Sequence, residues 1–195
     1  MPGFFDISGD TVKAAEAASS FRLVIPPTAK VFKDGASWTE LGRITEASSE
    51  VSKSTVEGRE CDILVLHLQI ELAKDGSGLN EGKTYKTNFR LNRWALENGR
   101  GAPKGTPMAG QKTMSLLSIA KMKAVLSACG FPPDGEEGTY TQALLAECFP
   151  DVNTFGAVPS PLIGQSFWHE VKQRESNKDG KSYTNYDIQN VLPSN

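Results

Sequence analysis

The chain has 195 residues, 38% of them hydrophobic, and a formal net charge of −2 at pH 7. This length and apolar content suffice for one domain with a core and exclude a chain that is disordered throughout. The charge excludes a protein coated in positive charge, so any contact with nucleic acid must come from local clusters of Lys and Arg. Two such clusters occur, in residues 83–112 and 172–181.

Export and membrane insertion are not expected. Cys61, Cys129 and Cys148 are an odd number of widely spaced cysteines, which is typical of reduced thiols. No apolar run approaches the ~20 residues of a spanning helix, and the first residues lack the order of a signal peptide. We expect a cytoplasmic protein that binds no membrane, in the host cytoplasm if its source is a virus.

The N-terminal region divides into an arm and the start of a domain. Residues 1–25 include a short alanine-rich run that is too short for an independent helix, and we expect them to form a mobile arm. A single domain is predicted over residues 26–195, with strand-like segments at 29–32 and 42–53.

Alternation of apolar and polar residues is clearest in residues 61–72, where the even positions from Leu64 to Leu72 are all large and apolar. This pattern predicts a strand with one face buried along its length. Residues 84–91 alternate in the same way, and the two segments are predicted to form a hairpin. The outward positions of the second segment are Lys86, Asn88 and Arg90.

Helical composition appears after a Gly- and Pro-rich loop at residues 98–110. Residues 115–128 are predicted to form a helix that begins at Ser115 and is capped by Gly130. A second, shorter helix is expected at residues 141–148.

A final hairpin follows, with Asp179-Gly180 as a strong turn signal inside the connection 175–181. Phe167 and Val171 are expected on one face of its first strand, and Trp168, Lys172 and Arg174 on the other. The whole order is strands, a helix and strands, with no internal repeat. It predicts a mainly β protein: a small, five-stranded, mostly antiparallel barrel of the OB type with an interrupting helix.

No enzyme signature is present. Gly82-Lys83-Thr84 resembles part of a phosphate-binding loop, but a strand follows it where that loop requires a helix. His67 and His169 lack partners at metal-ligand spacing, and no Gly-x-Ser-x-Gly motif occurs. We therefore predict no catalytic residue, no metal and no cofactor.

The predicted strands have one apolar face, and their other face carries amide, cationic and aromatic side chains in alternation. Cations neutralise phosphates, and aromatic rings stack on bases at ~1–3 kcal/mol each with little base preference. The competing interpretation is that these cations are ordinary solvated groups and that the tryptophans pack under the helix. The predicted DNA-binding residues are Lys86, Asn88, Arg90, Arg93, Trp94, Trp168, Lys172, Arg174, Lys178, Lys181 and Tyr183.

Over residues 44–193 this order resembles the bacteriophage-type single-stranded-DNA-binding proteins with an OB-fold. The resemblance rests on the strands at 62–72 and 85–91, the helix end at 126–131, and the segments 162–165, 171–172 and 183–188. It implies a protein that coats single-stranded DNA during viral replication and recombination, without a cofactor. Many members end in an acidic tail that recruits replication enzymes, which residues 191–195 do not resemble.

The function predicted here is binding of single-stranded DNA with little sequence preference. Replication or recombination proteins are candidate partners, and a homo-oligomer is left open. The alternative is a β-barrel module of a virion or replication complex that binds protein and no nucleic acid. Binding that weakens steeply with salt favours the first function, because each neutralised phosphate releases counterions.

Overall fold

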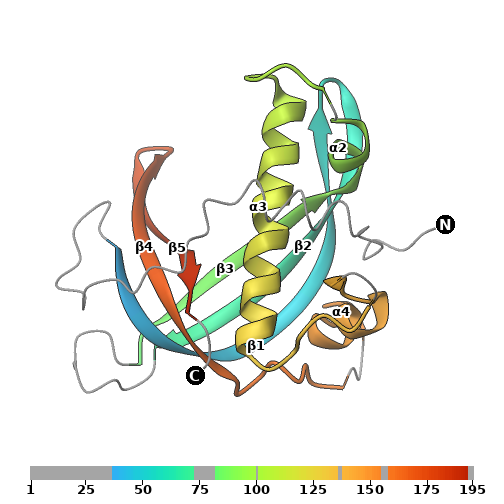
Figure 1. Ribbon diagram of the computed structural model, residues 1–195. Helices are drawn as coiled ribbons and strands as arrows, with labels where there is room; N and C mark the ends of the chain where they lie inside the picture. The colour runs from blue at the N-terminus through green and yellow to red at the C-terminus, as the bar shows by residue number, and fades with distance from the viewer. Residues whose placement is uncertain (1–36, 73–81, 100, 136–137, 155–157, 193–195) are drawn as a thin grey trace.

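The computed structural model describes residues 37–72, 82–99, 101–135, 138–154 and 158–192. The predicted arm and the predicted strand at 29–32 lie outside these residues. Figure 1 shows one strongly bent sheet that curls around a long helix. The described part of the chain is thus mainly β, as predicted.

Five strands form the sheet in the order β3-β2-β1-β4-β5, and every neighbouring pair is antiparallel. Their bounds are β1 Ser37–Val56, β2 Arg59–Leu72, β3 Thr84–Asn92, β4 Ser166–Lys178 and β5 Lys181–Val191. β1 is the centre of the sheet, because its first residues pair with β4 and its longer remainder pairs with β2. A bulge between Ile44 and Glu46 marks the change of partner, and bulges of this kind bend a strand.

Both tight turns have two residues with positive φ, the geometry that matches the twist of a hairpin. The Asp179-Gly180 turn joins β4 to β5 with φ of 53° and 73°, as the sequence predicted, although the strands extend further into the connection than expected. Glu57 and Gly58 join β1 to β2 with φ of 51° and 80°. This second turn was not predicted, because Glu is uncommon in the left-handed region.

Three described helices are α2 Arg93–Asn98, α3 Pro107–Ala128 and α4 Gln142–Cys148. The prediction that the long helix begins at Ser115 was wrong, and the loop before it is correspondingly shorter. Thr106 is the N-cap, with its hydroxyl accepting from the N–H of Ala109, and Pro107 occupies the first helical position. Pro is favoured there because its fixed φ suits the helix and no N–H is lost.

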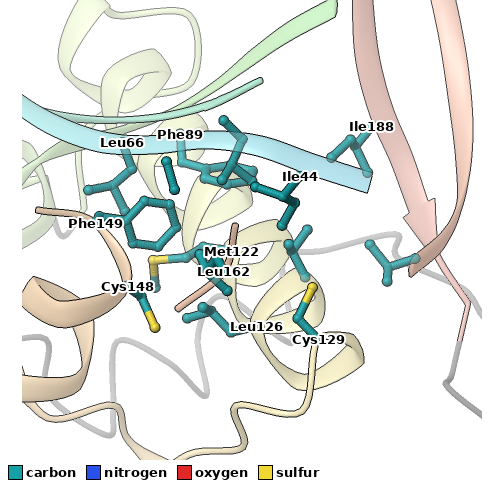
Figure 2. Packing of buried hydrophobic residues seen from close by; sticks show 14 of the residues in the cluster. Ile44, Leu66, Phe89, Met122, Leu126, Cys129, Cys148, Phe149, Leu162 and Ile188 are labelled. Carbon is teal, nitrogen blue, oxygen red and sulfur yellow. The ribbon is translucent and has the colours of Figure 1, made fainter. Parts of the chain in front are cut away.

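The core lies between the concave face of the sheet and α3 (Figure 2). Alternate residues of β2, from Leu64 to Leu72, are all buried, which confirms the predicted face. From the other side of the core, α3 contributes Leu116, Ile119, Met122, Val125 and Leu126. Phe149, which follows α4, and Leu162, which precedes β4, complete the packing.

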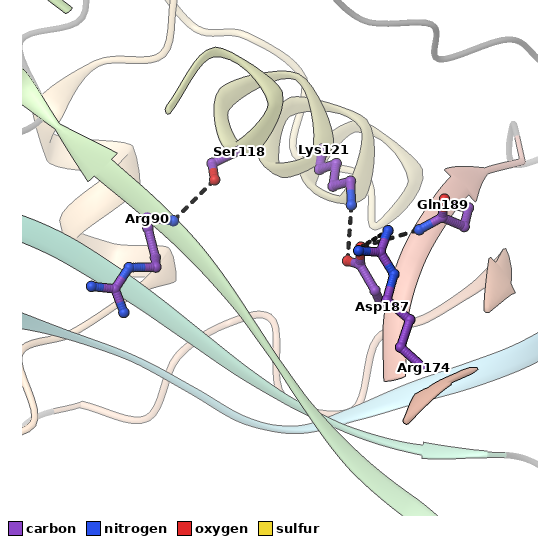
Figure 3. A network of polar contacts seen from close by, with 6 residues as sticks. All are labelled: Arg90, Ser118, Lys121, Arg174, Asp187 and Gln189. Carbon is purple, nitrogen blue, oxygen red and sulfur yellow. Dashed lines mark hydrogen bonds and ion pairs between the residues drawn. The ribbon is translucent and has the colours of Figure 1, made fainter. Parts of the chain in front are cut away.

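The two edge strands, β3 and β5, leave a seam in the barrel, which α3 covers (Figure 3). On one side of the seam, the backbone N–H groups of Arg90 and Asn92 donate to the hydroxyls of Ser118 and Ser115, at 3.0 and 2.9 Å. On the other side, Lys121 of α3 forms an ion pair with Asp187 of β5 at 2.8 Å. The helix therefore satisfies a strand edge that would otherwise be unpaired.

Candidate nucleic-acid interface

The outer face of β3 presents the three polar residues that alternation predicted, and we call Lys86, Asn88 and Arg90 the β3 row. All three are exposed, whereas Tyr85, Thr87, Phe89 and Leu91 between and beside them are buried. The face assignment made from the sequence is confirmed. The row runs beside the seam, because β3 is an edge strand.

Partners differ within the β3 row. Asn88 Oδ1 lies 2.8 Å from Nδ1 of His67, whose Nε2 lies 3.0 Å from a carboxylate oxygen of Glu50. Asn88 is therefore held in a chain of polar contacts that crosses β2 to β1. Within the described residues, neither Lys86 nor Arg90 forms a side-chain hydrogen bond or an ion pair. Their charges are free to meet phosphates.

The second cluster lies on the outer face of β4 and β5, and we call it the hairpin group. Its members are Trp168, Lys172, Arg174, Lys181 and Tyr183. Its two aromatic residues are the aromatic members of the exposed large hydrophobic residues in the described part of the chain, with Trp168 42% exposed and Tyr183 46% exposed. The side chain of Lys178, also predicted to bind DNA, lies outside what the structure describes.

Arg174 is the member of the hairpin group that already has an internal partner. Its Nη2 lies 3.8 Å from Asp187, whose carboxylate also meets Lys121 at 2.8 Å and Gln189 Nε2 at 3.1 Å (Figure 3). The Arg174 side chain is more than half exposed, and an ion pair of that exposure contributes at most about 1 kcal/mol. Arg174 can therefore exchange Asp187 for a phosphate at little cost.

Arg93 and Trp94, both predicted to bind DNA, lie just beyond the end of β3, on α2. The guanidinium of Arg59 lies over the Trp94 ring, 4.9 Å from its centroid, in a cation–π contact. Arg93 Nε donates to Glu97 at 2.6 Å. One face of Trp94 is thus occupied by a residue that the sequence did not indicate.

The two clusters are not neighbours within the sheet, because β2 and β1 separate β3 from β4. The outer faces of these intervening strands carry the carboxylates of Glu46, Glu50 and Glu71. The edge strands β3 and β5, which carry parts of the two clusters, approach each other across the seam instead, where the rings of Tyr85 and Tyr186 lie 5.7 Å apart. A DNA single strand that contacted both clusters would have to run along the seam, away from the acidic outer face of β1.

Inside the barrel, Tyr85 and His169 form a buried hydrogen bond. Nδ1 of His169 faces the carbonyl of Phe167, so this nitrogen carries the proton and Nε2 accepts from the Tyr85 hydroxyl. Burial lowers the pKa of His169 to about 4 and raises the pKa of Tyr85 well above its usual value. His169 is therefore a neutral core residue, not a contact for a ligand.

Other kinds of site have no support in the described residues. Nowhere in these ranges do three or more His, Cys, Asp or Glu side chains gather in a way that could hold a metal ion. Among the described helices, none is long and apolar enough to cross a membrane.

A five-stranded antiparallel sheet in this order, curled around a helix that lies between the third and fourth strands in the chain, defines an OB-like barrel. Neither a protein-family model nor a curated protein matches the sequence. Function must therefore be inferred from the barrel and its exposed side chains.

Proposed function

We propose that this protein binds single-stranded DNA with little base preference, using Lys and Arg for phosphates and exposed aromatic rings for bases. The observation that carries the proposal is the β3 row, where Lys86 and Arg90 are exposed and have no described partner. In OB-folds the face of strands 2 and 3 is the usual site for oligonucleotides. Two unpaired cations at this position supply the phosphate contacts that such binding requires.

The hairpin group supplies the aromatic half of the proposal. Trp168 and Tyr183 are exposed and share the outer face of the β4–β5 hairpin with Lys172 and Lys181. Stacking on such rings contributes ~1–3 kcal/mol per base and depends little on the identity of the base. This combination favours a coating protein over a sequence-specific one, and the resemblance to phage proteins suggests a role in viral replication and recombination.

The turns beside the proposed binding face are also placed to contact single-stranded DNA. OB-folds bind oligonucleotides with the loops between strands 1 and 2 and between strands 4 and 5 as well as with strands 2 and 3. Here the first of these loops is followed by Arg59 and the second by Lys181. Both loops are two-residue turns, so they can border a strand of DNA but are too short to enclose it.

The test compares two double variants with the same loss of charge. Lys86→Gln with Arg90→Gln removes two unpaired cations, and we expect affinity for a mixed-sequence single strand to fall roughly three- to tenfold for each. The control is Arg43→Gln with Lys53→Gln, whose side chains already pair with Glu71 and Glu60 at 3.0 and 2.6 Å. Equal losses in the two variants would contradict the proposed role of β3.

Binding is measured by quenching of tryptophan fluorescence and, independently, by anisotropy of a labelled oligonucleotide. Quenching by the single strand and not by its duplex is the expected result, because duplex bases are not free to stack. Absence of binding in both assays would refute DNA binding. It would favour the alternative in which the barrel binds a protein of a virion or replication complex.

A further inference from the structure

A pocket of about 370 Å³ opens at the end of the seam where β3 begins. It lies beside the β3 row but is not part of it. We call it the seam pocket, and the described residues that line it are Leu72, Gly82, Lys83, Thr84, Tyr85 and Tyr186. The residue types are an aliphatic side chain, two aromatic rings, a hydroxyl and a cation.

Backbone hydrogen bonds fix one wall of the seam pocket. The N–H of Leu72 donates to the carbonyl of Lys83 at 2.8 Å, and the N–H of Gly82 donates to the carbonyl of Leu72 at 3.0 Å. Gly82 has a φ of 73°, which a residue with a side chain rarely adopts. The end of β2 and the start of β3 are therefore held together at the pocket.

The two tyrosines form the aromatic part of the seam pocket, with their rings 5.7 Å apart and inclined at 50°. Tyr85 is buried and its hydroxyl is bonded to His169, which anchors the far end of its side chain. Tyr186 comes from the other side of the seam and is only half-buried. It is the ring that a bound planar group can reach.

We propose that the seam pocket receives one unstacked base of the bound single strand, which stacks on Tyr186 while Lys83 at the rim faces the adjoining phosphate. This inference rests on the proposed function and adds a defined base-binding subsite to it. The volume lies at the lower end of the range for small-molecule sites, so it suits one base and not a stack of several. Stacking on aromatic walls depends little on which of the four bases is bound.

The position of the seam pocket also indicates how bound single-stranded DNA could run across the protein surface. Thr84, which lines the pocket, is exposed on the same face of β3 as Lys86, and from Lys86 to Arg90 this outer face extends about 13 Å at ~3.3 Å per residue. A strand with one base in the seam pocket can therefore place its next phosphates along the β3 row. The β5 side of the seam leads back toward Tyr183 of the hairpin group.

The first experiment compares Tyr186→Leu with Tyr186→Phe. Loss of one stacked base corresponds to about 5- to 150-fold weaker binding of a short mixed-sequence single strand, from ~1–3 kcal/mol per base. The leucine variant should show this loss, and the phenylalanine variant should bind within about twofold of the unmodified protein because it keeps the ring. Equal affinity of all three proteins would overturn the seam pocket as a base site.

A second measurement uses the unmodified sequence, because Tyr186→Leu also removes a contact with Tyr85. The protein is produced with 3-fluorotyrosine, and the Tyr186 fluorine resonance is assigned by its disappearance in Tyr186→Phe. A single strand should shift this resonance, whereas an abasic strand of the same length should not. A Tyr186 resonance that stays in place while the strand binds would overturn the inference.

The outcomes separate this inference from the proposed function. If Lys86→Gln with Arg90→Gln weakens binding but the Tyr186 measurements show no effect, the protein binds single strands without using the seam pocket. If the unmodified protein binds no single strand, the proposed function fails and the base subsite fails with it.

Discussion

His169 is a buried titratable residue inside the barrel, and its environment affects the stability of the fold. Its imidazole is fully buried, bonded to Tyr85, and packed against Phe167 with ring centroids 4.7 Å apart. Burial keeps it neutral because the interior solvates a charged imidazole poorly. Stability should therefore depend on pH through this one side chain.

The pKa of His169 falls from its usual 6.5 to about 4 in the folded protein. Between these values the unfolded chain binds a proton that the folded chain does not, so stability rises with pH across this window. We expect the free energy of unfolding to be lower by about 3 kcal/mol near pH 4 than above pH 6.5 through this group. Urea unfolding of the unmodified protein and of His169→Gln measures it. The same pH dependence in both proteins would contradict the assignment.

Gly42 is the residue that makes room for His169. A Cβ at this position would lie 2.6 Å from Cε1 of His169 and 2.6 Å from Cγ2 of Ile70. Gly42→Ala should destabilise the protein by about 1–3 kcal/mol, the usual cost of overpacking a core. The matched control is Gly110→Ala in α3, where a Cβ meets nothing within 4 Å and alanine should stabilise by about 0.5–1 kcal/mol. Thermal unfolding of both variants tests the difference in sign.

At the scale of elements, α3 has a role that its composition alone did not indicate. Two of its serines, Ser115 and Ser118, accept hydrogen bonds from the edge of β3, and Lys121 reaches β5. The helix is thus a bridge across the seam as well as a cover for the core. Ser115, predicted as the first residue of the helix, lies inside it, facing the sheet.

Removal of these serine hydroxyls should have unequal effects. Ser115→Ala leaves the backbone N–H of Asn92 without a partner in a buried position, which costs about 1–3 kcal/mol. Ser118→Ala should cost less, because the N–H of Arg90 is in an exposed part of β3 where water can replace the hydroxyl. Urea unfolding of the two variants gives the comparison, and unchanged stability of Ser115→Ala would argue against α3 as the partner of the β3 edge.

Elements that depend on patterns of neighbouring residues could be predicted from the sequence, whereas features without such a pattern could not. The alternation of β2 and β3 and the Asp179-Gly180 turn follow from residues next to each other, and both were predicted correctly. The start of α3 was placed too late because its first turn, from Pro107 to Gly110, lacks the apolar periodicity by which helices are recognised. The position of Trp94 beneath Arg59 was not foreseeable, since no local pattern links these two residues.

At the scale of the whole molecule, the balance of charge on the outer face of the described sheet differs from strand to strand. The outer faces of β1 and β2 carry Glu46, Glu50 and Glu71, whereas the β3 row carries Lys86 and Arg90, which form no ion pair within the described residues. The hairpin group adds further cations, of which Arg174 is paired with Asp187. A net charge of −2 is therefore compatible with a local path for a polyanion.

This separation predicts how single-strand binding responds to salt. The logarithm of the binding constant should fall linearly with the logarithm of salt concentration, with a slope of about −0.7 for each neutralised phosphate. Lys86→Gln should reduce the magnitude of the slope by about 0.7, whereas Lys53→Gln, whose ammonium is paired with Glu60, should leave it unchanged. Fluorescence titrations at four or more salt concentrations give both slopes. A slope near zero for the unmodified protein would remove the electrostatic basis of the proposal.

The sequence by itself determined which side chains of each strand face the core and which face outward, because that alternation is a property of consecutive residues. It also determined the barrel class, through the order of strands and helix. Only the tertiary structure decided that β2 and β1 separate the two cationic clusters, that α3 bridges the seam, and that Tyr85 and Tyr186 meet to line a pocket. These features depend on strand order and register between residues up to about a hundred positions apart, which local periodicity does not encode.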